Sequence, residues 1–101
     1  GFRQFLRSYP ESGLADNSLY WIGECHYAKK MYAEAIDTFN ELLSRYRDGD
    51  KVPAANLKKG YALIELGRQG EGIAILKELI TRFPLSEEAS LAGQKIKEFN
   101  E

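Results

Sequence analysis

The side chains with the most evident chemical potential in this sequence are one cysteine and one histidine, Cys25 and His26. Adjacent side chains on a helix project about 100° apart, so this pair does not form a nucleophile and its base. We expect Cys25 to be a buried, inert thiol, because no cation or base is fixed beside it. We expect His26 to pack in a core. Asp and Glu recur at helical spacing without metal-ligand clustering. The sequence therefore predicts no catalytic residue, no cofactor and no metal site, and we look for function in its surfaces.

Three closely spaced glycines, Gly67, Gly70 and Gly72, are the other candidates for chemistry, because glycine-rich loops bind phosphates. Their order fits neither the Walker pattern nor the dinucleotide pattern, and no strand precedes them. We interpret Gly67 and Gly70 as loop residues and Gly72 as a point of close contact between two helices.

Composition excludes several classes of function. The chain has 101 residues, which favours one domain, and no apolar run approaches the roughly 20 residues of a membrane span. A formal net charge of −1 gives no electrostatic reason to expect a nucleic-acid partner. A single cysteine cannot form an internal disulfide.

The stretch from Leu19 to Tyr46 contains two amphipathic segments that meet at a short polar break at residues 29–31. Apolar residues in both segments follow the i, i+3, i+4, i+7 spacing of a helix with one buried face. A connection this short predicts that the second helix folds back antiparallel on the first. Gly23 and Ala35 are small residues at which the two backbones could approach closely.

This hairpin recurs with a period of 37 residues. Gly23 recurs as Gly60, and a four-residue apolar pattern appears three times, at Phe2, Phe5, Leu6 and Tyr9, at Phe39, Leu42, Leu43 and Tyr46, and at Leu76, Leu79, Ile80 and Phe83. Such self-similarity is typical of repeat architectures, in which stacked hairpins bury a continuous core. We therefore expect a single domain over 1–101, with 2–9 as the tail of a truncated upstream repeat, 12–47 and 49–84 as repeats, and 86–99 as a capping helix.

The capping signals and helix breakers set the expected helix boundaries. Ser12, Asp50 and Ser86 are candidate N-caps, and Pro53 suits the first turn of a helix. We expect helices at about residues 14–29, 32–45, 50–66, 71–82 and 87–99. In the last helix, Ala89, Ala92, Ile96 and Phe99 are expected to point inward. Phe2, Phe5 and Leu6 are expected to pack on the first of these helices and to leave an apolar edge exposed.

The repeat resembles the tetratricopeptide repeat, with its W-x₂-L-G-x₂-Y…A-x₃-F…P pattern. The first copy places Leu19, Ile22, Gly23, His26, Ala35, Phe39 and Arg47 on this pattern, and the second places Asn56, Lys59, Gly60, Leu63, Gly72, Leu76 and Pro84. His26, Lys59 and Arg47 depart from the pattern, and each unit is three residues longer than the usual 34. The resemblance implies an all-α fold in which helical hairpins stack as a right-handed superhelix or solenoid.

In stacked helix pairs, the first helix of each pair lines the concave face. We expect its side chains that face away from the hairpin core to form a partner-binding groove in which aromatic rings act as anchors. The predicted groove residues are Asn17, Tyr20, Trp21, Glu24, Tyr27, Leu57, Lys58, Tyr61, Glu65, Gln94, Lys95 and Glu98. The alternative is that Tyr20 and Tyr27 only fill space between neighbouring repeats.

The order Tyr-Pro-x-Ser, LADNSLYWIGECHYAKKMYAEAI and a Val-Pro-Ala-Ala-x-Leu-Lys-Lys-Gly-Tyr-Ala-Leu run is similar to the C-terminal domain of the YbgF (CpoB) family of Tol-Pal-associated periplasmic proteins. The resemblance covers residues 2 to 99. It implies a periplasmic protein of Gram-negative bacteria with a signal peptide and a coiled coil upstream, through which it could form oligomers. It also implies binding to TolA and coordination of outer-membrane constriction with peptidoglycan synthesis in cell division.

Two alternatives remain open at this point. A BamD-like outer-membrane assembly lipoprotein also carries Tyr-Pro-x-Ser repeats. A cytosolic repeat module that clamps the C-termini of its partners would show the same hairpins. All three interpretations are non-enzymatic and predict a protein or peptide partner.

Overall fold

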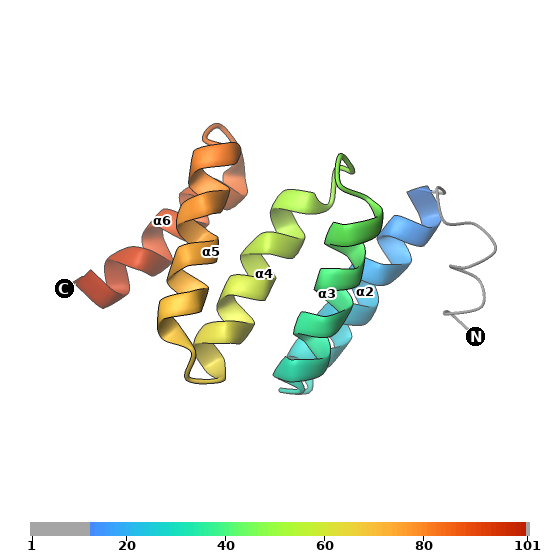
Figure 1. The fold of residues 1–101 in the computed structure, drawn as a ribbon, viewed down its shortest axis with the longest axis horizontal. Helices are drawn as coiled ribbons and strands as arrows, with labels where there is room; N and C mark the ends of the chain where they lie inside the picture. The colour runs from blue at the N-terminus through green and yellow to red at the C-terminus, as the bar shows by residue number, and fades with distance from the viewer. Residues whose placement is uncertain (1–12, 101) are drawn as a thin grey trace.

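Five α-helices form the described part of the chain, residues 13–100 of a computed structural model (Figure 1). They are α2 (Gly13–Ala28), α3 (Tyr32–Arg45), α4 (Val52–Glu65), α5 (Gln69–Arg82) and α6 (Glu87–Asn100). Residues 13–100 contain no strand, and the expected all-α helical-repeat fold is confirmed. The expected tail at 2–9, the cap at Ser12 and the apolar edge at Phe2, Phe5 and Leu6 lie outside the described residues.

The turns that close the two hairpins have the same geometry. Lys30 and Gly67 both have a positive φ, 63° and 85°. After each of them, a backbone N–H returns to the end of the preceding helix, from Met31 to the His26 oxygen at 2.8 Å and from Arg68 to the Leu63 oxygen at 2.9 Å. This is the six-to-one hydrogen bond of a Schellman motif, which ends a helix and reverses the chain. The sequence repeat is therefore also a repeat of turn conformation.

The helix starts differ from one repeat to the next. Ser86 caps α6 as expected, because its Oγ accepts a hydrogen bond from the Ala89 N–H at 3.0 Å. The expected cap at Asp50 is wrong. A tight turn, closed by the Val52 N–H on the Gly49 oxygen at 3.2 Å, places Lys51 at the cap position, where it makes no side-chain capping bond. Helix α5 begins at Gln69, two residues before the expected Glu71, because it starts as soon as the Gly67 turn is complete.

In each hairpin, a glycine on the first helix allows the second helix to pack closely against it. A Cβ atom added to Gly23 would overlap the Phe39 ring, and one added to Gly60 would lie 2.6 Å from Leu76 Cδ2. Phe39 and Leu76 are fully buried in these contacts. The absence of a side chain at the glycine is therefore what lets each helix pair approach closely enough to bury its largest apolar residue.

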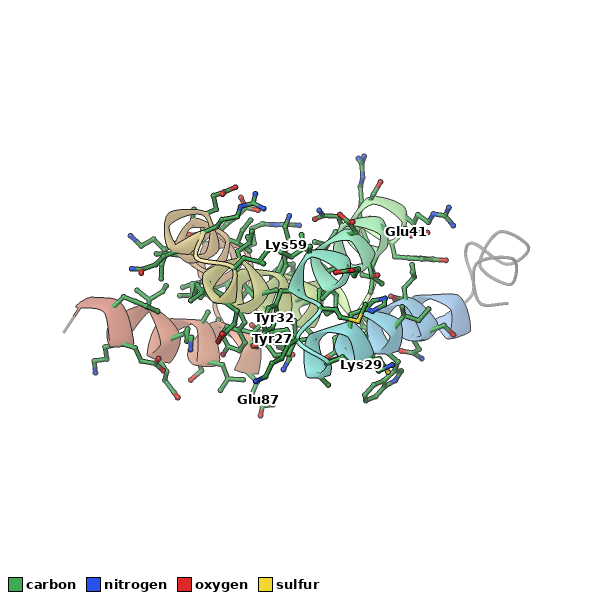
Figure 2. The ribbon with its side chains drawn as sticks, turned by 90° about the horizontal axis from the view of Figure 1, so that it is seen from below. Tyr27, Lys29, Tyr32, Glu41, Lys59 and Glu87 are labelled. Atoms are coloured by element: carbon green, nitrogen blue, oxygen red, sulfur yellow. The ribbon has the colours of Figure 1, made fainter. Side chains whose placement is uncertain are left out.

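The helices form two layers, one of α2, α4 and α6 and one of α3 and α5 (Figures 1 and 2). Helix α4 lies close to both α2 and α6, whereas no Cα atom of α3 lies within 8 Å of one in α5. A hollow of about 300 Å³ remains between α3, α4 and α5, lined in part by Leu43, Asn56 and Ile75. When the helices of one layer lie closer together than those of the other, the whole stack bends, and the closer layer lies on its concave side. The even-numbered helices therefore line the concave face.

Helix α6 buries less than the sequence suggested. Ala89 and Ala92 are buried and Ile96 is half-buried, but Phe99 is 39% exposed, so its expected inward position is wrong. The antiparallel partner α5 begins opposite the end of α6 with Gln69 and Gly70, which offer no apolar side chain. The last turn of α6 thus extends past the core.

Candidate protein-binding groove

Three tyrosines and three lysines alternate along the concave face. They are Tyr20 and Tyr27 on α2, Lys58 and Tyr61 on α4, Lys95 on α6, and Lys51 at the N-cap position of α4. We call this set the tyrosine–lysine groove. Each lysine ammonium lies over at least one ring face, at which the negative face of the aromatic ring attracts a cation.

Lys58 lies at the centre of the groove. Its Nζ is 5.1 Å from the Tyr27 ring centroid, 5.8 Å from that of Tyr61 and 3.7 Å from Glu24 Oε1. It therefore links α2 to α4 by one ion pair and two cation–ring contacts. Because Lys58 and Glu24 both keep about a quarter of their side-chain surface exposed, the pair orders the groove more than it stabilises the fold.

The two ends of the groove have the same arrangement. Lys95 Nζ on α6 is 5.5 Å from the Tyr61 ring centroid and 3.4 Å from Glu98 Oε1. Lys51 Nζ is 5.3 Å from the Tyr20 ring centroid. The Tyr20 hydroxyl donates a hydrogen bond to Glu24 Oε2 at 3.3 Å. Contacts between neighbouring even-numbered helices thus hold the rings and charges of the groove in place.

The phenol groups of the groove are protonated at neutral pH and can act as hydrogen-bond donors. Burial, followed by the negative charge of Glu24, raises the pKa of Tyr20 to about 12. Burial and then Glu65 raise the pKa of Tyr27 to about 12. Burial and then Glu98 raise the pKa of Tyr61. The same geometry gives a surface of phenol donors, ammonium groups and carboxylates, which suits hydrogen bonding to another protein chain.

Trp21 is the most exposed aromatic residue on this face, with 60% of its surface accessible. Its ring packs edge-on against Tyr20, with centroids 5.5 Å apart. Trp21, Lys58 and Lys95 occupy equivalent positions in successive repeats, and so do Glu24, Tyr61 and Glu98. Trp21 therefore continues the row of the two lysines toward the N-terminal end of the groove.

Most of the other predicted groove residues lie at the surface of α2, α4 or α6. Asn17, Glu65 and Gln94 are exposed. Leu57 is the exception, because it is 5% exposed and packs in the core cluster with Leu76 and Ala89. Its assignment to the groove was wrong, since it lies on the side of α4 that faces α5 and α6.

One residue of the groove and one that packs against it were missed from the sequence. Lys51 lies two helical turns before Lys58, so extending that stripe backwards would have found it. Tyr32, at the start of α3, is half-buried and packs edge-on against Tyr27 with centroids 5.3 Å apart (Figure 2). No sequence signal marked Tyr32, because its contact depends on how the hairpin turn places α3.

An open cavity of about 710 Å³ lies along α2, beside the groove. It is lined by Asn17, Ser18, Trp21, Ile22, Cys25, His26, Lys29 and Lys51. Cys25 is exposed in it, so the expected buried thiol is wrong. His26 and Ile22 are half-buried rather than packed in a core. These side chains lie on the face of α2 that neither α3 nor α4 covers.

Two kinds of feature were sought in residues 13–100, a cluster of metal-ligating side chains and a membrane-spanning helix. Within this range, no three His, Cys, Asp or Glu side chains come together as a metal site. No described helix is both long enough and apolar enough to cross a bilayer. What these residues do form is the tyrosine–lysine groove, in which aromatic and charged side chains hold one another in place.

The fold and the groove together define an α-helical repeat protein, built from antiparallel helix pairs and presenting a concave surface to other proteins. The chain belongs to the tetratricopeptide repeat family, whose model matches residues 17–49 and 54–86. The starts of the two matches are offset by the 37-residue period of the sequence. Repeats of this family are interaction modules, so the protein-binding character expected from the sequence is supported.

A curated relative extends this comparison. The chain is 27% identical over 108 residues to the outer membrane protein assembly factor BamD of Caulobacter vibrioides. The alignment covers 99% of this chain and 35% of that protein, so the chain spans about a third of the relative's length.

Proposed function

We propose that this chain is a protein-binding module of the bacterial cell envelope and that its tyrosine–lysine groove takes a segment of another envelope protein. The supporting observation is the ordered row of rings and ammonium groups on the concave face, with Trp21 exposed at one end. Exposed aromatic side chains beside satisfied polar groups are the usual composition of an interface hot spot.

The process that we propose for it is outer-membrane protein assembly. The supporting observation is the similarity to BamD, which runs along nearly the whole chain. A chimaera tests this proposal. The third of Caulobacter vibrioides BamD that aligns with this chain would be replaced by it in a strain depleted of BamD. Restored outer-membrane protein assembly is expected, whereas a chimaera that accumulates to the normal level without restoring assembly would contradict the proposal.

Binding to TolA in the periplasm is the second candidate. It is favoured by the order of sequence segments from Tyr9 to Leu63, which resembles the Tol-Pal-associated family. Calorimetric titration of this chain with a purified TolA fragment separates the two candidates. Saturable binding would support the Tol-Pal role, and no heat of binding at high concentration would remove it.

The groove itself is tested by one substitution with a matched control, using whichever partner binds. Trp21→Ala should weaken binding by about 2 kcal/mol or more, as truncation of a hot spot does. It should lower the free energy of unfolding by less than about 1 kcal/mol, because the ring is largely exposed. Leu85→Ala removes another exposed apolar side chain, in the α5–α6 turn, and should leave binding unchanged. Equal binding by both variants would place the interface elsewhere.

A further inference from the structure

Two of the three residues that depart from the repeat pattern lie in one place. Arg47 and Lys59 both line the hollow of about 300 Å³ between α3, α4 and α5. In the 37-residue period, Lys59 corresponds to Ile22 and Ile96, and Arg47 corresponds to Pro84. Packing of the repeats does not by itself require two basic side chains to converge here, because the corresponding positions of the other copies are uncharged.

Asn56 is a third polar side chain in the hollow. It corresponds to Leu19 of the first copy, which is 2% exposed and fills a core. Asn56 is only 7% exposed, and within the described part of the chain its side-chain amide has no hydrogen-bond partner. Buried polar groups are nearly always hydrogen-bonded. Because Asn56 lines the hollow, a partner can reach its amide from there.

The charged side chains of the hollow favour an anion. Arg47, Lys59 and Arg82 line it together with one carboxylate, Glu78, which leaves a formal charge of +2. Arg47 and Lys59 make no ion pair with any other described residue. Arg82 Nη1 is 3.7 Å from Glu78 Oε1, too long for a hydrogen bond, so the N–H groups of Arg82 remain available to a ligand. Guanidinium groups match the oxygen atoms of phosphate and carboxylate groups.

The rest of the lining is apolar and comes from Leu43, Val52 and Ile75. Small-molecule pockets occupy about 300 to 1,000 Å³, so the hollow has room for a small organic anion. A phosphate monoester carries a charge of about −1.5 to −2 at neutral pH, which matches the lining, whereas a carboxylate carries half of it. The combination of charges and apolar walls therefore suits a phosphate monoester of an apolar group.

We propose that the hollow between α3, α4 and α5 is a binding site for a phosphate monoester. The two guanidinium groups and the Lys59 ammonium bind the phosphate oxygens. The Asn56 amide donates a hydrogen bond to the same group from the buried side of the hollow. The apolar part of the ligand packs against Leu43 and Ile75.

The site is separate from the tyrosine–lysine groove, and the inference does not depend on the proposed function. Lys58 and Lys59 are adjacent on α4, so their side chains project about 100° apart. Lys58 lies in the groove over Tyr27, whereas Lys59 lies in the hollow, on the side of α3 and α5 (Figure 2). A ligand in the hollow therefore leaves the groove accessible.

Titration of this chain with phenyl phosphate tests the site, followed by nuclear magnetic resonance of the side-chain amides. We expect a saturable shift of the Asn56 amide signal. Benzoate has the same ring with a singly charged carboxylate, and inorganic phosphate has the charge without an apolar group. Both should bind more weakly than phenyl phosphate, because each lacks one part of the proposed recognition.

Two substitutions and a matched control test the residues. Lys59→Ile introduces the residue of the other two copies and should weaken phenyl phosphate binding at least about tenfold, as loss of a charge-assisted hydrogen bond does. Asn56→Leu introduces the residue of the first copy and should also weaken it. Lys97→Ile removes the same charge from an exposed position on α6 and should leave the affinity unchanged. Circular dichroism of each variant confirms that the helices remain folded.

A phosphate monoester could be a soluble molecule or a lipid headgroup, and vesicles distinguish the two. Phosphatidic acid carries a phosphate monoester, so flotation with vesicles of phosphatidylcholine and phosphatidic acid provides the lipid probe. Vesicle binding that is lost in Lys59→Ile and kept in Lys97→Ile would assign the site to a lipid. Absence of vesicle binding, in a chain that binds phenyl phosphate, would assign it to a soluble ester. Either result supports the site.

Three outcomes would overturn the proposal. The first is that phenyl phosphate at millimolar concentration leaves the Asn56 amide signal unmoved. The second is that Lys59→Ile and Lys97→Ile bind phenyl phosphate equally well, which would reduce the effect to the general charge of the chain. The third is that benzoate binds as tightly as phenyl phosphate, which would show that the hollow does not select a phosphate.

Discussion

Gly60 and Gly72 face each other where α4 crosses α5. A Cβ atom added to Gly72 would lie 2.7 Å from the Gly60 carbonyl oxygen, and one added to Gly60 would lie 3.3 Å from the Gly72 oxygen. Both distances are shorter than an ordinary carbon–oxygen contact, so the two backbones meet with no side chain between them. This is the contact point between helices that the sequence indicated at Gly72.

The crossing gives the first prediction. Gly72→Ala should lower the free energy of unfolding by about 2 kcal/mol, because the backbone of α4 cannot move aside as a flexible side chain could. The higher helix propensity of alanine, about 1 kcal/mol, only partly offsets this cost. Chemical denaturation measures the difference.

Gly70 is the matched control in the same helix, because a Cβ added there meets nothing within 4 Å. Gly70→Ala should leave stability unchanged or raise it by up to about 1 kcal/mol. If Gly72→Ala were as stable as Gly70→Ala, the close crossing would be wrong.

The second prediction concerns Lys30, which adopts a positive φ in the turn where the second repeat has Gly67. A side chain in this conformation costs roughly 1–2 kcal/mol, whereas glycine adopts it freely. Lys30→Gly should therefore raise the free energy of unfolding by about 0.5–1 kcal/mol, after the extra entropy of glycine in the unfolded chain is subtracted. Thermal melts measure this effect. Lys29→Gly, one residue earlier, should destabilise, and a loss of stability in both variants would contradict the prediction.

The sequence predicted the helices well because their signals are local. The spacing of apolar residues, the turn residues and the capping residues are all visible in short stretches of sequence. For this reason α3 was expected over its observed residues, and Ser86 was recognised as a cap. The misplaced cap at Asp50 has a local cause as well, since one extra residue in the turn shifts the cap to Lys51.

Which side chains are exposed was harder to predict, because exposure depends on which helix faces pack against each other. Leu57 and Tyr61 are four residues apart on α4, yet the first is buried and the second lines the groove. Cys25 was expected to be buried because no cation or base is fixed beside it, yet it is exposed, whereas its counterpart Ala62 is buried. Burial requires a neighbouring helix, and the described part of the chain supplies that neighbour for α4 and not for α2.

The third prediction concerns the tyrosines of the groove. Tyr20 and Tyr27 have pKa values of about 12 in the folded chain, against 10 for a free tyrosine. The folded state therefore holds their protons more tightly than the unfolded state does. The stability linked to these protons is fully present below pH 10 and is lost as the pH rises toward 12.

Absorbance of tyrosinate against pH measures this difference. A late-ionising component should appear in the folded chain and diminish in Tyr20→Phe and again in Tyr27→Phe. Urea should shift this component back to the ordinary range. A single transition near pH 10 while circular dichroism still reports folded helices would contradict the assignment.

The last prediction concerns Asp16, a carboxylate in the first turn of α2 that is 5% exposed. Its Oδ1 has no hydrogen-bond partner among the described residues, and Asp50 lies near enough to add a second negative charge. Burial, then Asp50, raises the pKa of Asp16 above its ordinary value of 3.8, while Lys51 partly opposes the shift. A buried charge without a partner destabilises the folded state.

Asp16→Asn should therefore raise the free energy of unfolding at neutral pH by about 1 kcal/mol, near the lower end of the cost of an unsatisfied buried group. The sign of the pH dependence follows from the raised pKa. The folded state binds the proton more tightly, so wild-type stability rises as the pH falls through the folded pKa toward 3.8. The advantage of Asp16→Asn should shrink over the same range. Urea denaturation of both proteins at neutral pH and below pH 3.8 measures it. An asparagine variant that is less stable at neutral pH would show that the Asp16 carboxylate is favourably paired in the folded chain.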